Sequence, residues 1–115
     1  MAARNSARAF AALKGSAPVF AALGDETRLR LVARLCHEAP LSIASLTDGS
    51  NLTRQAVTKH LRVMEAAGLV RSSPRGRENV WSLDQRRLQS ARRYLDLISG
   101  QWDDALGRLR EFVEK

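Results

Sequence analysis

The chain has 115 residues, a length that suits one compact domain with a small core. Its hydrophobic content of 44% argues against intrinsic disorder. Nineteen Lys and Arg against 12 Asp and Glu give a net charge of +7, which favours an anionic partner such as nucleic acid. A single cysteine excludes an intrachain disulfide and suits a cytoplasmic location, and no apolar run is long enough to span a membrane.

Residues 1–17 form an Ala-rich N-terminal extension, expected to be partly helical or flexible, that carries Arg but no acidic residue. A transit-like or membrane-surface segment is one interpretation of this composition. Because the apolar stretch is short and lacks a signal-peptide core, we favour a helix that packs on a partner chain. Residues 18–115 are predicted to form one domain.

Capping residues predict the helices at the start of that domain. Pro18 suits the first turn of a short helix over about residues 18–23. Gly24 suits its C-terminal end, and Asp25 suits the N-cap of a second helix over about residues 26–38.

A helix, a tight turn and a second helix follow. Ser42 is the predicted N-cap of a short third helix, and residues 48–51, Asp-Gly-Ser-Asn, have turn chemistry. Thr53 then caps a fourth helix, which Gly68 ends. Residues 69–73 and 79–83 are predicted strands around a basic turn at residues 74–77, so the fold is mainly α with a small β-hairpin.

The fourth helix has two chemically distinct faces. At 100° per residue, five polar side chains fall within an arc of about 140°, whereas Val57, Leu61 and Met64 lie opposite. The five are Arg54, Gln55, Thr58, Lys59 and Arg62. Residues 54–77 also contain six basic residues and one acidic residue. One face therefore suits the protein core and the other suits the groove of DNA.

The last helix, over about residues 84–114, has apolar residues at alternating spacings of three and four, the heptad period of a helix that packs along another helix. They are Leu88, Ala91, Leu95, Ile98, Trp102, Ala105, Leu109 and Phe112. Exposed, this stripe would promote aggregation, so we predict that it is buried against a second subunit. Gly100 and Gly107 weaken the helix, and a bend or break is expected near Gly100.

Three blocks of sequence resemble the ArsR/SmtB family of bacterial winged helix-turn-helix repressors. They are ALGDETRLRLVARL at residues 22–35, QAVTKHLRVMEAAGLV at residues 55–70 and RGRENVWSL at residues 75–83. The resemblance covers about residues 18–115. It implies a homodimer built through the first and last helices, with the fourth helix in the major groove of double-stranded DNA and the hairpin as a wing on the adjacent backbone or minor groove.

The resemblance also implies which residues contact DNA. It puts Arg54, Gln55, Thr58 and Lys59 at the DNA face and Arg75 and Arg77 on the wing. With Thr53 and Arg62, the predicted DNA-contacting set is Thr53, Arg54, Gln55, Thr58, Lys59, Arg62, Arg75 and Arg77. Arg54 and Gln55 suit base edges, because Arg pairs with guanine and Gln with adenine, whereas the others suit the phosphate backbone.

Many relatives sense metals, through paired cysteines near the third helix or through Asp, His and Glu on the last helix. Neither set is present, so no metal and no cofactor is predicted. Cys36 shares a helix face with Leu29 and Val32, which favours a buried core thiol over a metal or redox role. His60 is expected to hydrogen-bond within the domain or to a phosphate, and no catalytic constellation predicts an enzyme.

The sequence thus predicts a cytoplasmic, sequence-specific transcriptional regulator, a homodimeric repressor of a near-palindromic operator. An unidentified small-molecule effector is left open, since Trp102 and Phe112 could line an inducer pocket between subunits, although aromatic residues on a heptad stripe are more often core. The alternative function is a protein-interaction adaptor or antitoxin-like module that uses the C-terminal amphipathic helix.

Overall fold

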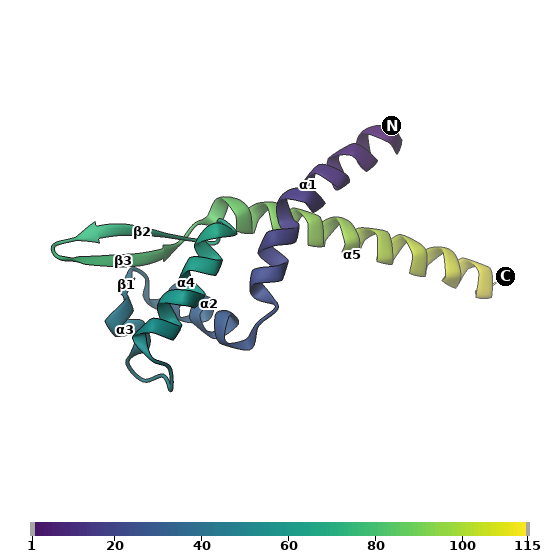
Figure 1. Ribbon diagram of the computed structural model, residues 1–115. Helices are drawn as coiled ribbons and strands as arrows, with labels where there is room; N and C mark the ends of the chain where they lie inside the picture. The colour runs from purple at the N-terminus through teal and green to yellow at the C-terminus, as the bar shows by residue number, and fades with distance from the viewer. Residues whose placement is uncertain (1, 115) are drawn as a thin grey trace.

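The computed structural model describes the backbone of residues 2–114 and the side chains of residue 11 and residues 14–114. These residues form five helices and a small three-stranded sheet, whose hairpin extends from one side of the body (Figure 1). In chain order the elements are α1 (Ala2–Leu23), α2 (Glu26–Glu38), β1 (Leu41–Ser42), α3 (Ile43–Thr47), α4 (Arg54–Ala66), β2 (Val70–Arg75), β3 (Glu78–Leu83) and α5 (Gln85–Glu114). The predicted order of helices and hairpin is confirmed.

Three predicted N-caps are present, and each satisfies a backbone N–H at the start of its helix. Asp25 Oδ2 accepts from Arg28 N at 2.9 Å at the start of α2. Ser42 Oγ accepts from Ser45 N at 3.1 Å, and Thr53 Oγ1 accepts from Ala56 N at 3.1 Å. These side-chain oxygens replace the partners that the first helical N–H groups lack, and they fix where α2, α3 and α4 begin.

α4 ends at a glycine in the left-handed region, as predicted. Gly68 has φ of 78° and donates its N–H to Glu65 O at 3.0 Å, while Leu69 N–H donates to Met64 O at 2.9 Å. These two bonds form a Schellman motif, which satisfies carbonyls at the helix end. Leu69 and Met64 are both fully buried, so the apolar contact that accompanies this motif turns the chain directly into β2.

The sheet contains a strand that was not predicted. β1 pairs with β3 through Leu41 with Trp81 and Ser42 with Val80, and the strand order is β1-β3-β2. The predicted turn at residues 74–77 was too long, because Pro74 pairs with Asn79 inside the hairpin. Proline is tolerated there since β2 is an edge strand, on which an N–H is not required. Gly76, with φ of 64°, begins the two-residue turn.

The prediction that Pro18 begins a helix was wrong. Pro18 lies inside α1, a helix of 22 residues that includes most of the predicted N-terminal extension; residue 1 is outside the described residues. The Pro18 ring is exposed, whereas Ser16, Val19 and Ala22 are buried. Packing of α1 along α5 thus offsets the hydrogen bond that proline removes, and α1 bends along its length (Figure 1).

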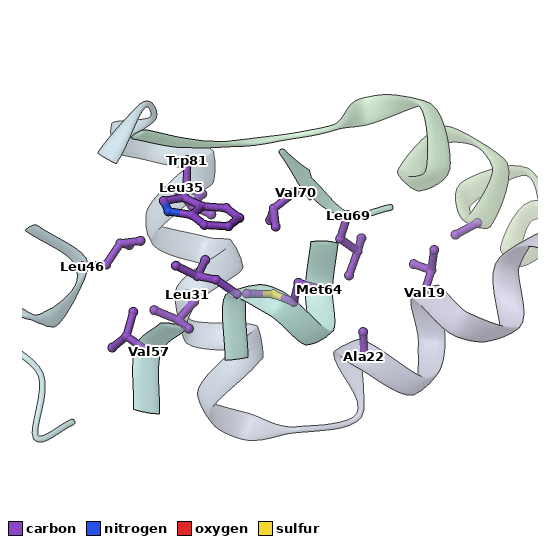
Figure 2. Packing of buried hydrophobic residues seen from close by; sticks show 12 residues of the cluster. Val19, Ala22, Leu31, Leu35, Leu46, Val57, Met64, Leu69, Val70 and Trp81 are labelled. Atoms are coloured by element: carbon purple, nitrogen blue, oxygen red, sulfur yellow. The ribbon is translucent and has the colours of Figure 1, made fainter. Parts of the chain in front are cut away.

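One hydrophobic cluster joins all the elements except the wing tip. Trp81 of β3 lies close to Leu35 of α2, and Val19 and Ala22 of α1 lie at the other end of the cluster (Figure 2). The apolar face of α4 contributes Val57, Leu61 and Met64, all with no exposed surface. Truncating a buried leucine or methionine to alanine typically costs about 2–5 kcal/mol, so this burial fixes the orientation of α4.

α5 is one continuous helix of 30 residues, so the expected break near Gly100 does not occur. Its first turns pack on α1, and the ring of Tyr94 lies 6.2 Å from that of Phe20. Its C-terminal part extends away from the body, opposite the wing, and the molecule measures 66 × 28 × 20 Å (Figure 1). Within residues 2–114, no helix is both long and apolar enough to cross a membrane.

Candidate nucleic-acid interface

α4 presents a polar face to solvent opposite its buried face. Arg54, Gln55 and Lys59 are exposed, and none of the three makes a side-chain hydrogen bond or ion pair among the described residues. The two threonines differ from them. Thr53 Oγ1 caps the helix, and the half-buried Thr58 donates its hydroxyl to Arg54 O at 2.7 Å. Both hydroxyls are thus hydrogen-bonded to backbone groups of α4.

Arg62 is exposed but engaged within the chain. Its Nη1 lies 2.9 Å from Glu65 Oε1, and its guanidinium carbon lies 5.6 Å from the ring centroid of Trp81. A cation above an indole face is a favourable arrangement, worth about 0.5–1 kcal/mol at exposed sites. Arg62 therefore joins the C-terminal half of α4 to β3. Its guanidinium is less free to contact a ligand than that of Arg54 at the N-terminus of the helix.

The wing carries the other basic side chains. Arg75 ends β2 and Arg77 follows Gly76 in the turn, and both are exposed. Arg71, which was not among the predicted DNA contacts, lies on the same strand and is exposed as well. Because side chains alternate along a strand, Arg71 and Arg75 share a face of β2. That alternation was the available signal, since both residues belong to the basic segment at residues 54–77.

The base of the wing is tied to α5 through Asp84. Its N–H donates to Leu69 O at 2.8 Å, and its carboxylate accepts from the Arg86 side chain at 3.0 and 3.2 Å. The hydrogen bond from the Arg86 guanidinium is the main cause that lowers the pKa of Asp84 to about 2. The same contact raises the pKa of Arg86. The Asp84 carboxylate, at the junction of β3 and α5, is therefore ionised at neutral pH.

Arg28 connects α4 to the ends of α1 and α2. Its Nε donates to Ala22 O at 2.6 Å, near the end of α1, and its Nη1 lies 3.4 Å from His60 Nδ1 on α4. The Arg28 backbone N–H is the main cause that lowers the pKa of Asp25. The contact between Arg28 and His60 is consistent with the expected hydrogen bonding of His60 within the domain. The role of Arg28 was not predicted.

Arg34 of α2 fixes the end of α3. Its Nη1 donates to three backbone carbonyls, those of Ser45 at 3.0 Å, Leu46 at 3.1 Å and Asp48 at 3.3 Å. The last carbonyls of a helix lack helical partners, and a charged donor satisfies them well. Arg34 therefore positions the turn that precedes α4. The sequence contains no local signal for this contact, which joins residues 11–14 positions apart.

Cys36 is exposed, so the prediction of a buried core thiol was wrong. The buried residues of α2 are Leu31 and Leu35, and Cys36 points about 100° away from Leu35. Leu29, whose helix face the cysteine shares, is itself 49% exposed. The buried face of α2 is therefore rotated by about 100°, or one residue, from the predicted face. Among the described side chains, no group of three or more His, Cys, Asp or Glu is arranged to hold a metal ion.

The predicted heptad stripe divides into two parts. Leu88 and Ala91 pack in the core of their own chain. Beyond them the stripe is largely exposed, with Leu95, Leu109, Trp102 at 63% and Phe112 at 79% exposure, while Ile98 and Ala105 are half-buried. Leu106 and Val113, also exposed, widen the apolar face. Burial of this face by a second subunit stays a prediction.

Residues 23–73 match the model of a family described as a helix-turn-helix domain. The chain is similar to the HTH-type transcriptional regulator Rv2034 of Mycobacterium tuberculosis, with 36% identity over 93 residues that cover 81% of this chain and 83% of the relative. It is also similar to the structure of an ArsR-like transcriptional regulator from Rhodococcus sp. RHA1, with 36% identity, coverage of 86% of this chain and 92% of that chain, and a TM-score of 0.74.

The fold extends to more distant structures. A homodimeric winged helix-turn-helix DNA-binding domain from Mycobacterium bovis shares 20% identity, covers 88% of this chain and 90% of its own, and has a TM-score of 0.63. At that identity the likeness concerns the fold alone. The matched helix-turn-helix segment contains α2 to α4, and the match to the Rhodococcus structure extends beyond this segment. This chain belongs to the ArsR family of winged helix-turn-helix transcriptional regulators.

Proposed function

We propose that this regulator is a homodimeric repressor that binds a near-palindromic operator, with α4 in the major groove and the β2–β3 wing on the adjacent backbone or minor groove. The observation that carries the proposal is the two-sided character of α4. Its Val57, Leu61 and Met64 are fully buried, while Arg54, Gln55 and Lys59 are exposed and without partners among the described side chains. A helix held rigidly on one side can read DNA with the other.

Specificity is assigned to the first turn of α4. Arg54 and Gln55 directly follow the N-cap Thr53, at the end of the helix that a helix-turn-helix protein points at base edges. Arg pairs with guanine O6 and N7, and Gln with adenine N6 and N7. Lys59, Arg75 and Arg77 are assigned to phosphates, together with Arg71, which lies on the wing face of Arg75. Arg62 contributes charge while it holds α4 to Trp81.

The dimer is assigned to the exposed part of the α5 stripe. Trp102, Leu106 and Phe112 lie on a helix that extends from the body, where a second copy could cover them (Figure 1). The homodimeric state of the Mycobacterium bovis domain of the same fold supports this assignment. A twofold axis would place two α4 helices on half-sites about 10 bp apart, or a multiple of that distance, so that the dimer excludes other proteins from a promoter.

Selection of bound duplexes from random-sequence DNA tests the proposal. The wild-type chain should enrich a near-palindromic site. The double variant Arg54→Ala and Gln55→Ala should lose the preference for that site over a scrambled duplex by about 30-fold or more, while weak nonspecific binding persists. Arg93→Gln, which removes an exposed α5 cation away from α4, is the control and should keep the preference.

Two results would contradict the proposal. Equal loss of affinity for every duplex in the α4 double variant would show that these residues do not read bases. A wild-type chain that stays monomeric at micromolar concentration and associates only with a foreign polypeptide would favour the alternative function, an interaction adaptor that uses the exposed α5 face.

A further inference from the structure

A cavity of about 280 Å³ lies between α2 and the turn that joins α3 to α4. The buried Leu31 and Leu46 form its apolar part, together with the half-buried Leu52. The remaining lining is polar, from Thr27, Arg30, Arg34, Gly49, Ser50 and Asn51. The lining thus carries two arginines and no acidic residue, beside three leucines. It contains no member of the predicted DNA-contacting set.

Both arginines keep donors for a further acceptor. Arg30 pairs with Glu26 at 2.6 Å, but both side chains are nearly four-fifths exposed, at 78% and 79%, and such pairs contribute little. Arg34 uses its Nη1 for three carbonyls. Its Nη2 lies 3.6 Å from Glu38 Oε2, which is too far for a hydrogen bond. A bound anion could therefore accept from Arg30 and Arg34 while most of their present hydrogen bonds remain.

We propose that this cavity binds a small carboxylic acid, whose carboxylate lies on Arg30 and Arg34 and whose apolar body lies on the leucines. Carboxylates are geometrically suited to guanidinium groups. The apolar lining favours an organic acid over inorganic phosphate, which would leave the leucines uncovered. A volume of about 280 Å³ is at the small end for ligand pockets, so the acid has one ring or a short acyl chain.

The position of the cavity couples it to α4. Gly49, Ser50 and Leu52 belong to the turn that leads into the N-cap Thr53. Arg34 holds the same turn through the carbonyl of Asp48. An acid that draws the Arg34 guanidinium toward itself weakens the longest of its three bonds, the one to the Asp48 carbonyl at 3.3 Å, and so shifts the first turn of α4 while the bonds to Ser45 and Leu46 remain. On the proposed DNA-binding function, on which this coupling rests, the bound acid lowers DNA affinity.

Binding is tested first without DNA, so that its outcome does not depend on the proposed function. The full chain is titrated with sodium benzoate at constant ionic strength, and its backbone amide resonances are followed. Saturable shifts are expected at Thr27, Leu31 and residues 49–52, while benzamide and inorganic phosphate bind at least about tenfold more weakly. Arg30→Gln should weaken benzoate binding about tenfold, and Thr27→Phe, which adds a large side chain to the cavity lining, should abolish the shifts. Arg93→Gln should match the wild type.

The site would be overturned if benzoate and benzamide shifted the same resonances equally, if shifts spread over the arginines of α5, or if Arg30→Gln bound benzoate as the wild type does. A second arm measures affinity for the selected duplex, which saturating benzoate should lower by about fivefold or more. Unchanged DNA affinity with benzoate bound would overturn the coupling. Weaker DNA binding by Arg30→Gln in the absence of benzoate would show that the cavity arginines contact phosphates of DNA instead of a small acid.

Discussion

Gly68 is required at the end of α4 for two separate reasons. Its φ of 78° lies in the left-handed region, which disfavours residues with a Cβ. A Cβ at this position would also lie 2.7 Å from Arg87 Cγ. Gly49 has the same backbone conformation, with φ of 77°, but a Cβ there would meet no other atom within 4 Å, so the two glycines separate backbone strain from steric clash.

Gly68→Ala should therefore destabilise the fold more than Gly49→Ala. The left-handed conformation alone costs a residue with a Cβ about 1–2 kcal/mol, which is the expected effect at Gly49. Gly68→Ala adds the clash with Arg87, and Gly68→Ala with Arg87→Ala should return the cost to that of Gly49→Ala. Urea denaturation measures the three values, and equal costs for the two single variants would argue against a tight contact with Arg87.

Arg34 contacts the end of α3 and the turn that precedes α4, whereas Gly68 lies after the C-terminus of α4. Its three hydrogen bonds reach carbonyls of α3 and of the following turn, so removal leaves those acceptors without their charged donor. Because the side chain is about one-third exposed, water replaces part of this interaction. Arg34→Ala is expected to lower the free energy of unfolding by about 1–2 kcal/mol.

Hydrogen exchange provides a local readout of that prediction. Amides of α3 and of residues 48–53 should exchange faster in Arg34→Ala, while those of α5 change only by the global loss of stability. Arg93→Gln, at an exposed position of α5, should change neither. Uniform acceleration across the chain would mean that Arg34 contributes to overall stability without positioning the turn.

At the scale of the elements, local signals were sufficient where one residue determines a boundary. Asp25, Ser42 and Thr53 cap their helices through bonds that span three residues, and Gly68 ends α4 through its own backbone. Distant contacts determine the rest. β1 exists because Leu41 meets Trp81, and Pro18 remains within α1 because α1 packs along α5. No window of sequence around Leu41 or Pro18 contains those partners.

The candidate site follows the same division. Exposure of Arg54, Gln55 and Lys59 could be predicted from helical period, since the opposite face is clearly apolar. On α2 the period is ambiguous, because Leu29 and Val32 also suggest an apolar face, and the prediction placed Cys36 in the core with them. The contacts of Arg28 and Arg34 could not be predicted, since arginine reaches acceptors far away in sequence.

The wing is expected to contribute affinity without base preference. Arg75 and Arg77 are exposed at the tip of the hairpin, with no base-reading geometry like that of a helix in the major groove. The double variant Arg75→Gln and Arg77→Gln should bind all duplexes more weakly and reduce the slope of log affinity against log salt by about 1.8, or about 0.9 for each phosphate that is no longer neutralised. Anisotropy titrations of selected and scrambled duplexes at several salt concentrations measure both quantities.

A change of sequence preference in the wing variant, with an unaltered salt slope, would contradict this assignment. The control is Arg93→Gln, which removes an exposed cation from α5. It should leave the slope close to that of the wild type, because α5 does not face the duplex in the proposed complex.

On the scale of the whole molecule, charge and apolar surface are segregated. Residues 54–77, with six basic residues and one acidic residue, contain α4, β2 and the hairpin turn. Residues 88–115 hold five basic and five acidic residues, and they carry the exposed apolar stripe along α5. A helix with balanced charge and an exposed apolar face suits contact with protein, whereas the basic end suits contact with phosphate. The two ends can thus be altered independently.

Trp102 and Leu109 test whether the exposed stripe joins two subunits. In the single chain they are 63% and 58% exposed and contribute nothing to the core, so Trp102→Ser with Leu109→Ser should leave the fold intact. In a twofold dimer each substitution acts twice, and the dissociation constant should rise by about 100-fold or more. Sedimentation at micromolar concentration should show a dimer for the wild type and a monomer for the variant.

The matched control is Asp103→Ser with Asp104→Ser, which alters the same turn of α5 on its polar face and should remain dimeric. Loss of the dimer should also weaken binding to a two-half-site operator far more than to a single half-site, because the second α4 is no longer delivered with the first. A wild-type monomer, or a Trp102 and Leu109 variant that stays dimeric, would place the subunit contact elsewhere and leave the exposed α5 face to a different partner.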